Sequence, residues 1–266
     1  MSIKKPKPVS GFSKLSKRGK IRWLVENFFT HPEEVARELK SFWYGDPQKQ
    51  QIFDQFSENF VQAFSHDEVV HGKGSLVNKM GQTEEADRLA NLRALLALQW
   101  AWPGKKTLFM GCEFGQWKEW DCDAPLDWAL LNFPLHAGVS KLVRDLNRLY
   151  LSHSSWSDND HKGDKFRWID CNDKCNQTLS FLKYGDRPND TLLVACNFSD
   201  QLIHRNWGCP HPGGWKVLLD SDSPDYGGTG CAGATEFSSQ PHESNFFPQS
   251  LSFSVGRWSI RILGLN

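Results

Sequence analysis

The chain of 266 residues lacks several features that would assign it to a common class of protein. Its seven cysteines form an odd set without C-x-x-C spacing, which argues against a zinc site and a disulfide framework. Its 31 basic and 31 acidic residues cancel, which argues against a nucleic-acid partner. The start of the chain has no continuous apolar run long enough for a signal peptide or a membrane span. We therefore expect no nucleic-acid or membrane partner and a reducing, cytoplasmic compartment.

Residues 1–56 lack any strand that ends in Asp or Glu flanked by small residues. The acidic residues of the segment 32–39 alternate with apolar ones as on a helix with one exposed face, so we expect solvated carboxylates there. Residues 1–22 contain eight basic residues and no acidic one. This composition favours a disordered, solvated tail over a surface that binds nucleic acid or another anion. The aromatic residues at 27–29 and 42–44 pack on a helix or on a missing partner surface, and the role of residues 1–56 stays open.

The most informative motif is Ser65-His66-Asp67-Glu68, which follows the apolar stretch Phe60–Phe64. Glycines at positions 72 and 74 allow the chain to turn sharply after it. A carboxylate at the C-terminal end of a parallel strand, followed by such a loop, is typical of the ligand-binding face of a barrel enzyme. The pair His66 and His71 beside Asp67 and Glu68 also fits a metal site, which is an alternative at this point.

Two strand–helix units follow from the apolar pattern. The first is the strand Phe60–His66 with a helix over residues 84–102, and the second is the strand Lys106–Gly111 with a helix over residues 136–150. Thr83 with two glutamates predicts a capped helix start, and Pro103-Gly104 predicts its end. We expect each helix to cover a sheet, and the apolar run Thr107–Met110 to be a buried parallel strand.

From residue 155 onward the pattern changes to short strands separated by turn residues. The spacing predicts an antiparallel β-sandwich that holds its own core. The expected strands are Phe166–Asp170, Thr178–Tyr184, Thr191–Asn197, Trp215–Leu219, Ser250–Val255 and Trp258–Leu263.

The loop Cys112–Leu135 is long for a connection and is rich in tryptophans and acidic residues. Aromatic faces and carboxylates are what a sugar-binding surface uses. A loop held in place by its own buried tryptophans explains the same composition equally well.

Several long motifs resemble the C-terminal part of 1,4-α-glucan (glycogen) branching enzymes of the α-amylase superfamily. They are SENF with SHDEVVHGKGSL, then NLRALLALQWAWPGKKTLFMGCEF, then HAGVSKLVRDLNRLY, and the segment Asp222–Gly228 is similar to a motif of the family's C-terminal domain. The resemblance covers residues 57–266. Cys112 departs from it, because Asn is common there in the family.

The resemblance implies roles for individual residues. Asp67 matches the third catalytic carboxylate, which stabilises the transition state, and His66 matches a histidine that binds the sugar and is explained better so than as a metal ligand. We assign His66, Glu68 and Trp128 to substrate contact. The reaction needs no metal or organic cofactor. The nucleophile and the proton donor of such enzymes lie upstream of this motif in the family, and we do not find them here.

The resemblance therefore implies an α/β plus all-β fold: a partial (β/α)8 barrel, with its last two strand–helix units, followed by an antiparallel β-sandwich. The expected parts are 1–56 of unclear role, 57–154 from the barrel and 155–266 as the C-terminal domain. A complete barrel alone takes about 250 residues, so a whole barrel does not fit beside the second domain.

Three interpretations stay open. The chain is a truncated or split branching enzyme that acts on an α-glucan such as glycogen or amylose, with a complementary barrel fragment as partner. Alternatively, it is a non-catalytic glucan-binding or regulatory module, or a decayed gene product. Because parallel strands expose unpaired edges, we expect the two-unit part to associate with something or to be the least stable region.

Overall fold

The computed structural model describes residues 61–158 and 162–266. Every described residue belongs to a single unit of the chain. The expectations for the basic tail, the aromatic residues 27–29 and 42–44 and the helix over 32–39 lie outside the described residues. No helix in the described part of the chain is both long enough and apolar enough to cross a membrane.

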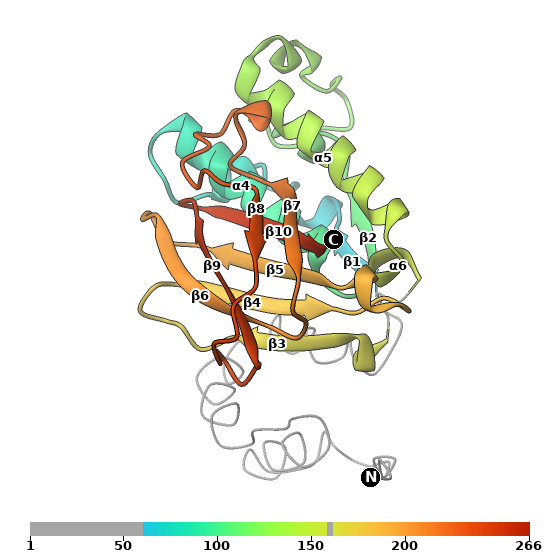
Figure 1. Cartoon of the computed structure of the whole chain (residues 1–266). Helices are drawn as coiled ribbons and strands as arrows, with labels where there is room; N and C mark the ends of the chain where they lie inside the picture. Colours follow the sequence, from blue (N-terminus) through green and yellow to red (C-terminus); the bar gives the residue numbers. More distant parts are fainter. Residues whose placement is uncertain (1–60, 159–161) are drawn as a thin grey trace, which may run out of the picture. The chain divides into compact units, whose positions relative to one another are not determined.

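The first half contains two short parallel strands and two long helices (Figure 1). Strands β1 and β2 pair in parallel from Val61 opposite Lys105 to Phe64 opposite Leu108, as expected. Short 3-10 helices fill the connections: η2 (His66–Glu68), η3 (Val77–Lys79), η4 (Cys112–Phe114) and η5 (Trp128–Asn132). The longer elements are β1 (Val61–Phe64), α4 (Glu85–Ala101), β2 (Lys105–Leu108), α5 (Pro134–Ser152) and α6 (Ser154–Ser157).

The strand β2 is not buried, which corrects the expectation for Thr107–Met110. Its residues alternate between exposed and half-buried, and Val61 of β1 is 54% exposed. Within the described residues this sheet consists of β1 and β2 alone, so neither strand has a second neighbour to cover it.

Helix α4 begins and ends close to the expected positions. Its apolar stripe, Leu89, Leu92, Leu96 and Trp100, is buried. The predicted cap at Thr83 is wrong, because Glu84 occupies the N-cap position and makes no side-chain capping bond. The acidic residues of the first turn still complement the helix dipole.

Helix α5 does not cover a sheet, in contrast to the prediction. Its buried apolar residues are Val139, Leu142, Val143 and Leu146. The helix packs mainly against α4 and against the 3-10 helices η4, η5 and η8 (Pro224–Tyr226). The 3.6-residue period correctly gives the apolar stripe but does not identify its partner.

The second half is the predicted antiparallel β-structure. All six expected strands are present, and β6 and β8 are additional. One sheet has the order β3-β4-β5-β10-β7-β8, and the other contains β6 and β9. The strands are β3 (Phe166–Asp170), β4 (Thr178–Lys183), β5 (Leu192–Asn197), β6 (Ile203–Cys209), β7 (Gly214–Asp220), β8 (Glu236–Ser238), β9 (Gln249–Val255) and β10 (Ser259–Leu265), with the 3-10 helices η6 (Gly163–Lys165) and η7 (Pro188–Asp190) between them.

The central strands of the large sheet, β4, β5 and β10, are buried on both faces. One face shares a core with β6 and β9, to which Leu193, Leu263, Trp207 and Phe253 belong. Residues that alternate with this set, among them Val194 and Ile262, are also fully buried. Helix α4 packs against β5 and β10, so the arrangement has three layers, with the large sheet between α4 and the pair β6–β9 (Figure 1).

Polar and aromatic contacts join α4 to the sandwich. The buried Arg93 donates from Nε to the Ser221 carbonyl at 3.0 Å, and Arg257 pairs with Asp87 at 2.7 Å. Burial lowers the pKa of Arg93 to about 10, although Asp222 and Asp220 oppose this shift. Helix α4 of the first half therefore packs against the sandwich of the second half.

Candidate functional site

The loop after β1 starts with a capping box that fixes the backbone at His66 and Asp67. Ser65 Oγ accepts the Asp67 N–H at 3.1 Å, and Glu68 Oε2 accepts the Ser65 N–H at 2.6 Å. The side chains of His66 and Asp67 are 57% and 68% exposed, with His66 Nε2 3.3 Å from Asp67 Oδ1. Both side chains are exposed at the C-terminal end of β1. Ser65 Oγ donates to Asp67 Oδ2 at 3.4 Å, and Ser65 also contacts one Glu68 oxygen, Oε2.

The glycine-containing turn that follows is held by Glu119, 45 residues or more away along the chain. Gly72 and Gly74 adopt positive φ angles of 78° and 70°, and their N–H groups donate to Glu119 Oε1 at 2.8 Å and Oε2 at 2.6 Å. These two backbone hydrogen bonds hold the pKa of Glu119 below its ordinary value. The Glu119 carboxylate thus fixes the shape of the loop that carries Asp67.

Two lysines tie the same loop to itself. Lys73 Nζ donates to the Asp67 carbonyl at 2.6 Å, and Lys79 Nζ donates to the Glu68 carbonyl. These bonds use the carbonyls of the 3-10 helix and leave the Asp67 carboxylate free of the two ammonium groups.

Phe109, which follows β2, joins the two strand ends. Its N–H donates to the Phe64 carbonyl at 2.9 Å, and its ring lies 6.1 Å from the His66 ring and 5.2 Å from the Trp120 ring. Because the strands are parallel, both C-terminal ends meet at one edge, and Phe109 forms an apolar support beside His66.

The tryptophans of the loop Cys112–Leu135 fall into two groups: Trp117 and Trp120 are half-buried and Trp128 is exposed, and the sugar-binding interpretation of the loop stays a prediction. Trp117 packs edge-on against the buried His136, with ring centroids 6.1 Å apart, and Trp120 packs on Phe109. Trp128 is 56% exposed and rests on Phe114 with centroids 5.2 Å apart. Two tryptophans therefore hold the loop, while the third presents a face to solvent.

His136 connects this loop to the start of α4. Its Nδ1 is 2.8 Å from the Phe114 carbonyl, and its Nε2 is 3.4 Å from Glu85 Oε1. Because the Phe114 ring packs on the exposed Trp128, His136 helps to hold Trp128 in place through its contact with the Phe114 backbone.

Cys112 is buried at the start of η4, and burial raises the pKa of its thiol to about 12. A thiol with this pKa stays protonated at neutral pH and is a poor nucleophile.

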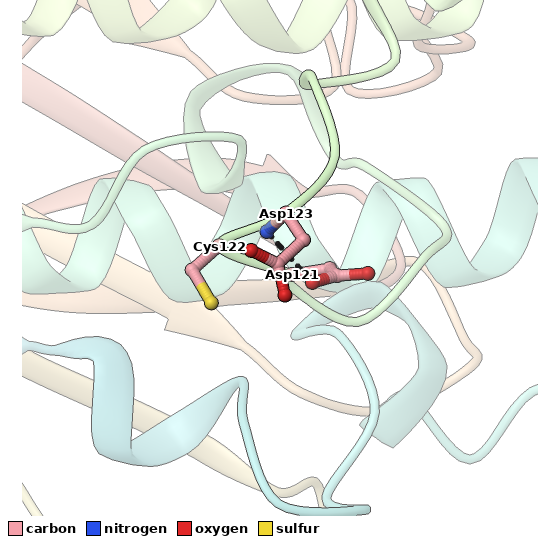
Figure 2. A group of neighbouring side chains, drawn as sticks. All are labelled: Asp121, Cys122 and Asp123. Carbon is pink, nitrogen blue, oxygen red and sulfur yellow. Dashed lines mark hydrogen bonds between the residues drawn. The ribbon is translucent and has the colours of Figure 1, made fainter.

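Within residues 61–158 and 162–266, one group of three side chains has its possible metal ligands close together. Asp121, Cys122 and Asp123 are consecutive, all are exposed, and their ligand atoms lie within 4.8 Å of one another (Figure 2). The Asp123 N–H donates to Asp121 Oδ1 at 2.9 Å, so a local turn accounts for the grouping.

The structure thus brings His66, Asp67 and Glu68 together at one strand end, and it places Trp128 on Phe114 in the long loop. Sequence reasoning missed the role of Glu119 and the position of Phe109 between the strand ends. Paired glycines at positive φ signal that a carboxylate can accept their N–H groups, but they do not say which one.

Residues 168–266 match the family model described as "Alpha amylase, C-terminal all-beta domain". This match agrees with the antiparallel strands β3 to β10 and defines the class of the second half of the chain.

Much of the chain is similar to 1,4-alpha-glucan branching enzymes, the family that the motifs predict. It is 48% identical over 198 residues to the 1,4-alpha-glucan branching enzyme GlgB of Burkholderia thailandensis, an alignment that covers 74% of this chain and 24% of that protein. The GlgB of Nitratidesulfovibrio vulgaris is 50% identical over 185 residues, with 67% and 28% covered. The GlgB of Aquifex aeolicus is 42% identical over 204 residues, with 76% and 32% covered. The chain spans about a quarter to a third of the length of these relatives.

Proposed function

We propose that this chain contributes the C-terminal portion of a 1,4-α-glucan branching enzyme, a glycosyltransferase of glycogen biosynthesis. The observation that carries the proposal is the exposed pair His66 and Asp67 at the C-terminal end of a parallel strand, in a chain that is 48% identical to a GlgB over 198 residues. The substrate is an α-glucan, glycogen or amylose. Seven free thiols suit a reducing compartment, so we assign the reaction to the cytoplasm.

In the proposed reaction an α-1,4 link is cleaved, the glucan is held on an aspartate, and the chain is transferred to a 6-hydroxyl. The Asp67 carboxylate faces the oxocarbenium-like centre and strengthens hydrogen bonds to ring hydroxyls as positive charge develops. His66 donates to a sugar hydroxyl, Glu68 uses the oxygen not held by Ser65, and Trp128 supports a sugar face. Asp67 supplies neither the nucleophile nor the proton donor, and we assign both to another polypeptide.

The domains in this proposal are residues 57–154 as the last two strand–helix units of a (β/α)8 barrel and residues 155–266 as the C-terminal domain. The partner is a complementary barrel fragment that adds parallel strands beside β1 and β2. Exposed apolar side chains at Val61 and Met110 and the uncovered β2 support such an addition.

A second candidate is a non-catalytic glucan-binding module. The exposed Trp128 favours it, because an aromatic face held by Phe114 and His136 binds a sugar without any catalytic carboxylate.

The test is to incubate the purified chain with amylose, alone and with a barrel fragment taken from residues upstream of the matched region of a GlgB. We expect new α-1,6 links only in the mixture, and we expect Asp67→Asn to abolish them while Asp123→Asn, an exposed acid of the loop, keeps them.

Branching by the isolated chain would contradict the assignment of nucleophile and acid to a partner. Glucan retention without branching in either sample would favour the binding module. A mixture that associates and branches equally well with Asp67→Asn would remove Asp67 from the site.

A further inference from the structure

An open groove of about 540 Å³ lies on the all-β domain, between the β3–β4 connection and the start of β6. Its size falls in the range of pockets that bind small organic ligands, about 300–1,000 Å³. The groove is made by the sandwich, whereas His66 and Asp67 follow β1 in the first half of the chain. Its lining residues are Asp170, Asn172, Asp173, Asn176, Leu202, Ile203, His204 and Arg205.

The polar groups of the groove are fixed by one another. Arg205 pairs with Asp170 Oδ2 at 2.8 Å and with Asp173, and it also donates to Thr178 Oγ1 at 2.7 Å. The Asn176 side chain donates to both Asp173 oxygens at 2.8 and 2.9 Å. The lining therefore keeps its shape without a ligand, which lowers the entropic cost of binding one.

The groove holds two carboxylates, Asp170 and Asp173, and one guanidinium, Arg205. Burial opposes ionisation of Asp173, but hydrogen bonds from Asn176 and Thr178 and the charge of Arg205 outweigh it and lower the pKa of Asp173. Two carboxylates against one guanidinium disfavour an anionic ligand. The guanidinium between the two carboxylates likewise disfavours a metal ion.

One exposed apolar side chain lines this polar surface, and a second belongs to the residue after an asparagine that is hydrogen-bonded to it. Leu202 lines the groove and is 51% exposed. Phe246 is 59% exposed, and its neighbour Asn245 donates to the groove residue Asp170 at 3.5 Å.

The backbone at Asn245 and Phe246 has φ angles of 51° and 63°, a left-handed conformation that is rare for phenylalanine. Such backbone strain is retained where the surrounding structure imposes it, often at ligand sites. Here it occurs at an exposed phenylalanine, one residue after the asparagine that contacts the groove residue Asp170.

We propose that this groove binds a segment of α-glucan, as a binding site separate from the one at Asp67. A neutral, polyhydroxylated chain donates hydroxyls to Asp173 and Asn172, accepts from Arg205, and lays its C–H face on Phe246 or Leu202. Because the groove is open, a polymer enters and leaves at its ends. The inference rests on the proposed α-glucan substrate but requires no catalysis by this chain.

The test is an NMR titration of the full ¹⁵N-labelled chain with maltoheptaose, with cellohexaose as the β-linked comparison. We expect shifts at the amides of 172–176 and 202–205 with maltoheptaose. Phe246→Ala and Leu202→Ala should each weaken binding about three- to tenfold, the effect of one lost aromatic or apolar contact. Leu151→Ala, at a leucine on α5 that is 76% exposed, is the control and should leave the affinity unchanged.

Absence of shifts in these two segments, or unchanged affinity in both groove variants, would overturn the proposal. Equal binding of cellohexaose would overturn its α-glucan specificity. Failure of the branching assay with the barrel fragment, beside intact groove binding, would instead count against the proposed catalytic function alone.

Discussion

Trp102 offers a sharp test of the claim that the first half of the described chain is built on the sandwich. This side chain ends α4 and is 7% exposed. Its ring lies 5.8 Å from Phe166, 5.6 Å from Trp168 and 5.6 Å from Phe181, all on strands β3 and β4. The tryptophan thus joins the segment that leads into β2 to the face of the large sheet opposite the core shared with β6 and β9.

Trp102→Ala should cost about 3–5 kcal/mol, the range for removing a buried aromatic side chain. Each of the three ring contacts contributes about 0.5–1.5 kcal/mol beyond the area buried. Because domains are stable by only about 5–15 kcal/mol, this loss is a large fraction of the total. With a urea m-value of about 2–3 kcal/mol/M, the unfolding midpoint should fall on the order of 1–2 M.

Urea unfolding followed by circular dichroism measures the effect, with Trp128→Ala as the matched control. Trp128 is mostly exposed, so its removal should change stability by no more than about 0.5 kcal/mol. Trp102→Phe keeps an aromatic ring and should fall between the two, which preserves the test if the alanine variant does not fold. Equal midpoints for Trp102→Ala and Trp128→Ala would refute the reasoning.

Four further predictions concern other parts of the chain. Glu119→Gln should speed hydrogen exchange at Gly72 and Gly74, because an amide can accept only one of their two N–H bonds; unchanged exchange would remove Glu119 from the loop's support. Gly138→Ala should cost about 1–3 kcal/mol and lower Tm by several degrees, because the added methyl overlaps the Tyr226 carbonyl, whereas Gly81→Ala has open space and should not. Iodoacetamide should modify the exposed Cys122, Cys175 and Cys231 but not Cys196, because Cys196 is buried and burial raises the pKa of its thiol. Modification of Cys196, detected by mass spectrometry of the native protein, would show that the core of the sandwich is accessible and would contradict the structure. Hydrogen bonds from Gly72 and Gly74 lower the pKa of Glu119, and those from Arg187 lower the pKa of Asp190. The two carboxylates therefore contribute fully to folding stability above their ordinary pKa values of 4.5 and 3.8, and this contribution is lost as the pH falls below those values. Urea midpoints that do not decrease from pH 6 to pH 3 would contradict this prediction.

The sequence predicts elements whose pattern is strong and local. The strands of the large sheet are apolar runs between turn residues, and all those expected were found. Strand β6 was missed because His204, Arg205 and Asn206 interrupt its apolar pattern, and β8 because it has only three residues. The partner of α5 was wrong because periodicity describes one helix and not what it packs against.

The site shows the same limit. The position of His66 and Asp67 at a strand end follows from a local motif, and the structure has them there. Their loop is held by Glu119, which accepts the N–H of Gly72. Because Glu119 is 47 residues from Gly72 in the sequence, no local pattern identifies it as the acceptor.

The large sheet lies between α4 on one side and β6 and β9 on the other, and this arrangement limits where the chain can be shortened. The family match begins at residue 168, but helix α4, which lies before that point, packs against strands β5 and β10. Removing the residues before 168 would remove α4 from strands β5 and β10 and would expose an apolar sheet face to water, with Val194, Cys196, Ile260 and Ile262 among its buried residues. A shortened chain made for crystallisation or for fusion to an upstream fragment should therefore keep α4 and the sandwich on one polypeptide.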